Sequence, residues 1–167
     1  GWGLPAAVGA AFATGRRVIC ITGDGGLMMN IQELATIAHH QLNIKIFVFW
    51  NQGYATIKET QELGFEGRLM GVNKDTGLSF PDFSALAWAH GIRPFNIHEQ
   101  SNLHDDVAKT LAGDEPILVN IWMNPDQPQA PRALNRRNAD GTMNPTKLED
   151  SFPFIPPEIL AKEMEIE

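Results

Sequence analysis

The stretch IKIFVFW at residues 44–50 constrains the fold more than any other part of the sequence. Six of its seven residues are apolar, and Lys45 is the exception. A strand that is apolar on both faces is typical of a parallel sheet covered by helices on each side. Residues 18–22 (VICIT) form a second run of this kind. The sequence therefore predicts an α/β protein.

Helical patterns alternate with these strands along most of the chain. Pro5 suits the first turn of a helix that ends near Gly15. Asn30 and Glu33 have the spacing of an N-terminal capping box. This alternation predicts a doubly wound parallel sheet with helices on both faces. The expected helices cover residues 4–14, 30–40, 54–63, 81–90 and 101–112, and the expected strands cover residues 17–22, 44–50, 93–97 and 117–122.

The composition changes at Asn124, beyond which seven prolines interrupt a polar segment. We expect an α/β part over residues 1–123 and an extended, Pro-rich C-terminal tail over residues 124–167, with a short helix from Pro157. A chain of 167 residues suits one domain, so the tail is expected to belong to the same domain.

The charge balance argues against two classes of partner. A net charge of −7 is unfavourable for binding a nucleic-acid backbone or an anionic membrane, and no apolar stretch reaches membrane-spanning length. The single cysteine, Cys20, lies in an apolar run and cannot form an intrachain disulfide. These features fit a cytoplasmic protein.

Two of the expected strands end in polar turns that contain glycine. Gly23-Asp24-Gly25-Gly26 follows the first strand, and Asn51-Gln52-Gly53 follows the second. Asp24 and Asn51 are 27 positions apart, the length of one strand–helix–strand crossover. Because the carboxyl ends of adjacent parallel strands meet at one edge, we expect the two side chains to lie close together.

The residues of these turns match the ligand chemistry of a metal-bridged diphosphate. Carboxylate, amide and backbone carbonyl oxygens are hard ligands that suit Mg²⁺, and phosphate oxygens complete its coordination. Gly25 and Gly26 would present bare N–H groups near a helix N-terminus, where anionic oxygens are stabilised. Two alternatives remain open: a tight glycine turn without a ligand, and a flavodoxin-like fold that binds another phosphate ligand without Mg²⁺.

Gly23-Asp24-Gly25, followed after 25 residues by Asn51, resembles the thiamine diphosphate (ThDP) motif of the acetolactate synthase and pyruvate decarboxylase superfamily. The segments GWGLPAAVGAA and GDGGLMMNIQELATIAHHQLNIKIFVFWNQGY are similar to the same family. The resemblance covers about residues 1–122 and is weaker in the tail. One departure is Trp50, which stands where many members have a second asparagine.

The resemblance implies a role for each residue of the two turns. Asp24, Asn51 and the carbonyl of Gly53 would ligate Mg²⁺, and the backbones of Gly25 and Gly26 would contact the diphosphate. The expected cofactor-binding residues are Gly23, Asp24, Gly25, Gly26, Asn51, Gly53 and Tyr54. The resemblance further implies an acetolactate synthase-like transferase or lyase that acts on 2-oxo acids.

The same resemblance places the activating glutamate on a pyrimidine-binding domain of the same or another subunit. No residue of this chain is therefore assigned a catalytic role, and a homo-oligomer such as a dimer is expected. Because Gly1 lies inside a family motif, we expect a fragment of a longer enzyme. The alternatives are the natural diphosphate-binding subunit of a two-chain 2-oxo acid decarboxylase and a non-catalytic phosphate-binding module.

Other polar and aromatic residues have weaker functional patterns. Tyr54, Ile57 and Gln61 have the spacing of one helix face, which builds either core or a wall of a substrate pocket. His39 and His40 lie at an expected helix end, where interaction with the last carbonyls explains them without a catalytic role.

Overall fold

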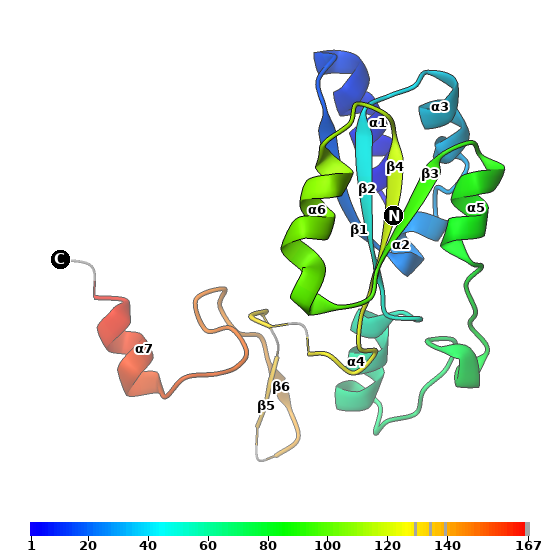
Figure 1. Ribbon diagram of the computed structural model, residues 1–167. Coiled ribbons are helices and arrows are strands. Elements are labelled where there is room, and N and C mark those ends of the chain that lie inside the picture. Colours follow the sequence, from blue (N-terminus) through cyan, green and yellow to red (C-terminus); the bar gives the residue numbers. More distant parts are fainter. Residues whose placement is uncertain (129, 134, 139, 166–167) are drawn as a thin grey trace. The chain divides into compact units, whose positions relative to one another are not determined.

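Helices and strands alternate through the first 126 residues of the chain (Figure 1). The computed structural model describes residues 1–128, 130–133, 135–138 and 140–165. The chain divides into two compact units, Gly1–Asp126 and Gln127–Glu167. The first unit contains, in chain order, α1 (Gly3–Thr14), β1 (Val18–Gly23), α2 (Asp24–Met28), α3 (Glu33–His39), β2 (Ile44–Trp50), α4 (Ala55–Gly64), the 3₁₀ turn η1 (Lys74–Thr76), α5 (Phe83–Ala89), β3 (Arg93–Ile97), η2 (Gln100–Asn102), α6 (Leu103–Leu111) and β4 (Ile117–Trp122).

The four strands of the first unit form one parallel sheet in the order β1–β2–β4–β3. β2 and β4 lie at its centre, and most of their residues are buried, as their continuous apolar runs predict. The strands expected over residues 44–50, 93–97 and 117–122 form with those bounds, and the first strand ends one residue later than expected. The predicted parallel α/β sheet is confirmed.

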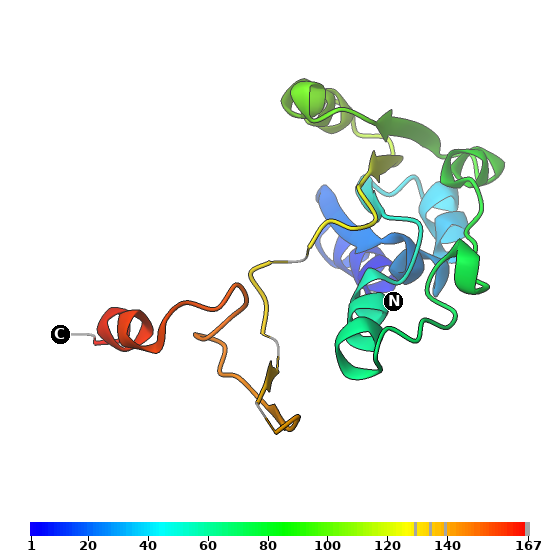
Figure 2. The same ribbon diagram turned by 90° about the horizontal axis from the view of Figure 1, so that it is seen from below.

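Helices pack against both faces of this sheet (Figure 2). On one face α1, α2, α3 and α5 form a core with Cys20, Ile46 and Leu118 of the strands. On the other face Val107 and Leu111 of α6 pack against a cluster that contains Phe47 and Val119. The helix side chains buried in the first core include Leu4, Ala7, Val8, Leu27, Leu34, Ile37, Phe83 and Ala87.

The edge strand β1 is covered unevenly. Val18 and Cys20 contact the first core, whereas Ile19 and Ile21 on the opposite face of the strand are 53% and 62% exposed. Coverage by helices is therefore complete for the central strands and partial for β1.

The helix expected from Asn30 begins later, and its predicted capping box is wrong. The chain turns into α2 directly at Asp24, and α3 begins only at Glu33 after a turn. The Asn30 side chain donates to the carbonyl of Gly1 at 2.7 Å, so it ties down the start of the chain instead of capping α3. The N-cap residue of α3 is Gln32, and no side-chain hydrogen bond caps the helix.

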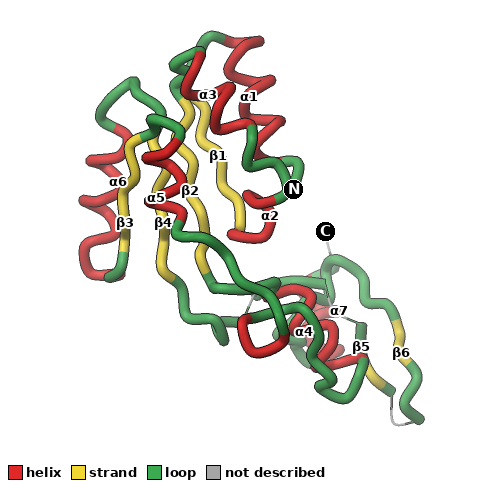
Figure 3. The backbone as a smooth tube through the Cα atoms, turned by 90° about the vertical axis from the view of Figure 1, so that its right-hand side faces the viewer, coloured by secondary structure: helices red, strands yellow, loops and turns green. Residues whose placement is uncertain are grey.

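The second unit contains the short antiparallel pair β5 (Arg136–Arg137) and β6 (Met143–Asn144), followed by α7 (Pro157–Glu163) (Figure 3). Arg132 and Phe152 pair through two backbone hydrogen bonds of 3.1 and 2.7 Å. The short helix expected from Pro157 is present as α7. None of the helices in the described ranges is long and apolar enough to cross a bilayer.

Lys45 is fully buried in β2, although its neighbours along the strand are apolar. Its Nζ donates to the carbonyl of Glu115 at 2.5 Å, close to the amino ends of the strands. Burial lowers the pKa of Lys45 below its ordinary value of 10.5, and the neighbouring charge of Glu115 acts in the opposite direction. Desolvation of the ammonium therefore outweighs its electrostatic compensation.

Lys45→Met should raise the free energy of unfolding at pH 7 by about 1 kcal/mol, because an apolar chain of similar length avoids the desolvation cost. The pKa of Lys45 is lower in the folded than in the unfolded state, so the wild type gains stability as the pH rises towards 10.5. The advantage of the variant should shrink over that range. Urea denaturation at pH 7 and pH 10 measures both effects, with Lys109→Met as an exposed control.

Candidate functional site

The polar turns at the ends of β1 and β2 lie side by side. The parallel register pairs Gly23 with Phe49, so Asp24 and Asn51 emerge at the same edge of the sheet. The Asn51 amide nitrogen, in the orientation that satisfies its neighbours, donates to Asp24 Oδ2 at 3.2 Å and to the carbonyl of Gly53 at 2.7 Å. The structure thus brings together the three groups predicted as metal ligands.

The Asp24 carboxylate is 2% exposed and is held by backbone amides. Its Oδ1 accepts from the N–H of Gly25 at 2.7 Å, and its Oδ2 accepts from the N–H of Gly53 at 3.2 Å. Burial raises the pKa of Asp24 above 3.8, and hydrogen bonds from the backbone of both turns act in the opposite direction. The charged form is therefore incompletely compensated by the protein alone, and a cation would favour it.

The donor set fits a hard divalent cation. With the Asn51 amide in its other orientation, its oxygen lies 2.7 Å from the carbonyl oxygen of Gly53 and 3.2 Å from Asp24 Oδ2. Three oxygens of three chemical types then face one another, as Mg²⁺ or Ca²⁺ requires. In the described part of the chain no three His, Cys, Asp or Glu side chains gather around one point, so a transition-metal site of that kind is not found there.

The turn after β2 has a restricted backbone. Gln52 has a φ of +64°, a left-handed conformation that costs on the order of 1 kcal/mol in a residue with a side chain. Gly53 packs so closely that a Cβ on it would overlap the carbonyl oxygen of Val72, and the next N–H, that of Tyr54, donates to the same oxygen at 2.8 Å. The carbonyl of Gly53 belongs to the same peptide unit as the N–H of Tyr54, so the hydrogen bond from Tyr54 to Val72 restrains the position of this carbonyl.

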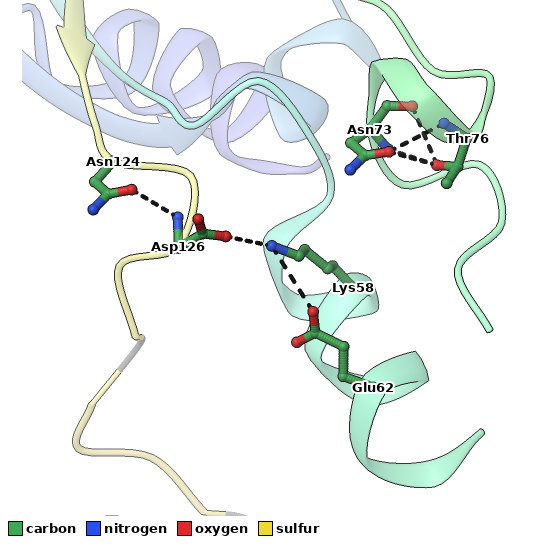
Figure 4. Close-up of polar contacts among 6 residues, drawn as sticks. All are labelled: Lys58, Glu62, Asn73, Thr76, Asn124 and Asp126. Carbon is green, nitrogen blue, oxygen red and sulfur yellow. Dashed lines mark hydrogen bonds and ion pairs between the residues drawn. The ribbon is translucent and has the colours of Figure 1, made fainter. Parts of the chain in front are cut away.

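The loop that carries Val72 is itself fixed by hydrogen bonds (Figure 4). Asn73 Oδ1 accepts from the backbone N–H of Thr76 at 3.1 Å and from its Oγ1 at 2.8 Å. Thr76 Oγ1 in turn accepts from the N–H of Val72 at 3.0 Å. The backbone N–H of Asn73 also donates to Thr76 Oγ1 at 3.0 Å, and this bond together with the two accepted by Asn73 Oδ1 forms the capping box of η1. The loop against which Gly53 packs is stabilised by these contacts.

The three glycines at and after the end of β1 differ in how closely other side chains pack against them. A Cβ on Gly25 would overlap the ring of Tyr54, and one on Gly26 would lie 2.8 Å from Thr22 Oγ1, whereas Gly23 has open space around it. The N–H of Gly25 is occupied by Asp24, so it is not free in the way that the sequence predicted. Gly26 lies in the first turn of α2, where helix amides have no partner within the helix.

Tyr54 links the two turns. Its ring lies against Gly25 and makes an edge-to-face contact with Phe80 at a centroid distance of 5.8 Å. Gly25 has no side chain, and this leaves room for the Tyr54 ring. The ring therefore packs the turn after β1 against the start of α4.

The structure does not gather the remaining candidates around the two turns. Ile57 is 49% exposed on α4. The Gln61 side chain accepts a hydrogen bond from the N–H of Met70 at 2.8 Å and donates one to the carbonyl of Met70 at 3.2 Å. Gln61 thus closes the loop after α4. His39 and His40 end α3 as expected and pack edge to face at 4.7 Å.

A pocket of about 400 Å³ opens beside the turn after β2. It is bounded by that turn, by the start of α4, by the loop after Val72 and by the chain after β4. The residue types at Val72 and Gln52 carry no signal of these roles, because both residues act through the position of the backbone. The residues that line the pocket include Asn51, Gly53, Lys58, Asn73, Lys74 and Asp126.

Comparisons with known proteins agree with this geometry. A family model described as "Thiamine pyrophosphate enzyme, C-terminal TPP binding domain" matches residues 1–121. The chain is 37% identical over 121 residues to the acetolactate synthase large subunit of Cyanidium caldarium, which covers 72% of this chain and 20% of that protein. It is 33% identical over 165 residues to the acetolactate synthase isozyme 2 large subunit of Escherichia coli K12, which covers 98% of this chain and 26% of that protein.

Among solved structures, the chain is similar to a thiamine diphosphate-dependent 4-hydroxybenzoylformate decarboxylase of Rhodococcus jostii RHA1. The TM-score is 0.67 at 28% identity, and the match covers 75% of this chain and 23% of that one. The chain thus spans about a fifth to a quarter of the length of these relatives. The family match and the parallel α/β fold agree, and the chain belongs to the thiamine pyrophosphate enzymes, whose C-terminal TPP binding domain it contains.

Proposed function

We propose that the chain binds thiamine diphosphate through a Mg²⁺ ion held by Asp24, Asn51 and the backbone carbonyl of Gly53. The observation that carries this proposal is the position of the Asn51 amide at the carboxyl edge of the sheet, 3.2 Å from Asp24 Oδ2 and 2.7 Å from the carbonyl oxygen of Gly53. Membership of the family supports the cofactor, and the chemistry of the three ligands supports the metal.

Each residue of the two turns has a distinct task in this proposal. Asp24 contributes the negative charge, Asn51 a neutral oxygen, and Gly53 a carbonyl whose position is fixed by Val72. The backbone at Gly23, where an added Cβ would meet no neighbour, and the first turn of α2 at Gly26 would contact the anionic diphosphate. The bound cofactor would supply electron-sink chemistry for decarboxylation and carboligation of 2-oxo acids. This chain's share is to orient the cofactor, which lowers the entropic cost of reaction.

The full activity is proposed for a longer enzyme of which this chain is a part. The Escherichia coli large subunit aligns with 98% of the chain, including the tail, and extends well beyond it. We propose an acetolactate synthase-like transferase or lyase, active on 2-oxo acids in the cytoplasm. A pyrimidine-binding domain of the same or another subunit would supply the activating glutamate, in a dimer or larger homo-oligomer.

Calorimetric titration of ThDP into the full-length gene product, with Mg²⁺ and then with EDTA, tests the proposal directly. We expect binding in Mg²⁺ and its loss in EDTA, because the diphosphate is held through the metal. Equal binding in both solutions would reject the metal site, and absence of binding in Mg²⁺ would reject the cofactor.

Asp24→Asn should weaken Mg²⁺-dependent ThDP binding at least about 100-fold, because the site loses its only charged ligand. The melting temperature of the cofactor-free protein should change little, because removal of a buried charge is offset by the loss of one accepted hydrogen bond from Gly25 or Gly53. Asp105→Ala, a change at an exposed position in α6, is the matched control and should leave binding unchanged. Binding of wild-type strength in Asp24→Asn would contradict the ligand assignment.

Gly53→Ala should displace a metal ligand, because the added Cβ would overlap the carbonyl of Val72 and the backbone must move. We expect about a tenfold or greater loss in Mg²⁺ affinity and a decrease of about 1–3 kcal/mol in the free energy of unfolding. Gly64→Ala is the control, since a Cβ there meets open space at the end of α4. If both variants bind Mg²⁺ equally well, the position of Gly53 is not critical for the site.

A further inference from the structure

The chain that leaves β4 contacts both sides of the turn formed by residues 51–53. On the upstream side, the N–H of Met123 donates to the carbonyl of Trp50 at 3.0 Å. On the downstream side, Asp126 Oδ1 lies 2.5 Å from Nζ of Lys58, in the first half of α4. We call residues 123–126 the clasp, because this short segment bridges the residues that flank the turn.

The clasp has internal support for the position of Asp126. Asn124 Oδ1 accepts from the backbone N–H of Asp126 at 3.0 Å, which fixes a local turn (Figure 4). Lys58 also lies 3.9 Å from Glu62 one helical turn further along. The Lys58 side chain is 23% exposed and that of Asp126 is 76% exposed, so water screens the carboxylate of the pair more than the ammonium.

α4 depends on such polar contacts for its position. Among its described residues none is buried, so apolar packing contributes little to holding the helix. Its start is fixed by the hydrogen bond from Tyr54 to Val72, and the backbone N–H of Lys58 donates to the carbonyl of Tyr54 at 2.8 Å. The ion pair with Asp126 therefore acts one helical turn from Tyr54, the residue that follows Gly53.

The turn is conformationally strained, because a positive φ at Gln52 has a free-energy cost for a residue with a side chain. A turn of this kind keeps its shape only when contacts outside it restrain both ends. Met123 restrains the end at Trp50, and the pair of Lys58 with Asp126 restrains the end at α4.

We propose that the clasp positions the metal-binding turn, with Lys58 and Asp126 as positioning residues for the Mg²⁺ ligands Asn51 and Gly53. This inference rests on the proposed function. Lys58 lines the pocket beside the turn, but Asp126 and Glu62 satisfy its charge. Its role is therefore to hold the helix in place and not to bind an anionic ligand.

The test compares Lys58→Met and Asp126→Asn with the wild type in the full-length gene product. At saturating ThDP, each variant should raise the Kd for Mg²⁺ about two- to fivefold, the range expected for losing a partly exposed ion pair. The double variant should lose no more than the larger single loss, because both changes remove one interaction. Lys58→Arg keeps the charge and should bind Mg²⁺ within about twofold of the wild type.

A second measurement needs neither metal nor cofactor. Hydrogen exchange at the amides of Gly53 and Tyr54 reports the turn directly, since these amides donate to Asp24 and Val72. Both amides should exchange faster in Lys58→Met, while the melting temperature changes little. Lys109→Met removes an equivalent pair with Asp106 on α6, at 2.9 Å, and should leave exchange at the turn unchanged.

The outcomes separate this inference from the function on which it rests. If the wild type shows no Mg²⁺-dependent ThDP binding, the proposed function fails, and the inference fails with it. If the wild type binds but Lys58→Met matches Lys109→Met in both Kd and exchange, the clasp is rejected. Additive losses in the double variant would also reject it, because the two residues would then act independently.

Discussion

The buried carboxylate of Asp24 is the constraint to which the surrounding structure responds. A charge that is 2% exposed must be compensated, and the two backbone amides that reach it come from different turns. That arrangement is possible only because β1 and β2 are adjacent and parallel, with Gly23 level with Phe49. The pairing of two strands thus determines where three candidate ligands meet.

The two ends of the sheet handle charge in different ways. At the amino ends, Lys45 is paired with a carbonyl, and Arg17 and Arg93 lie 3.5 and 2.8 Å from Asp114 and Glu115. Arg17 and Arg93 therefore have carboxylate partners, whereas the burial of the Lys45 ammonium is only partly compensated. At the carboxyl ends the described hydrogen-bond partners of Asp24 are amides and include no cationic side chain, and its pKa is raised. Asp24 is thus an incompletely compensated carboxylate at the edge where α/β sheets bind their ligands.

Much of this arrangement could be predicted from the sequence, and the reasons are physical. The bounds of β2 and β4 were predicted correctly because a run that is apolar except for one residue (Lys45 in β2, Asn120 in β4) is typical of a strand buried on both faces. The meeting of Asp24 with Asn51 followed from crossover length and parallel topology. The start of α3 was missed because the chain enters α2 directly at Asp24 and a turn then separates α2 from Glu33, which the spacing of Asn30 and Glu33 did not indicate. The φ of Gln52 and the contact at Val72 are backbone properties that leave no mark in residue type.

The indole rings of Trp50 and Trp122 lie 4.1 Å apart between their centroids, at an angle of 58°. One precedes Asn51, and the other ends β4 just before residues 123–126. Two chromophores this close couple electronically, and the chain's other two tryptophans, Trp2 and Trp88, are 77% and 66% exposed. The near-UV circular dichroism of these two coupled indoles therefore depends on the position of the turn at residues 51–53 relative to residues 123–126.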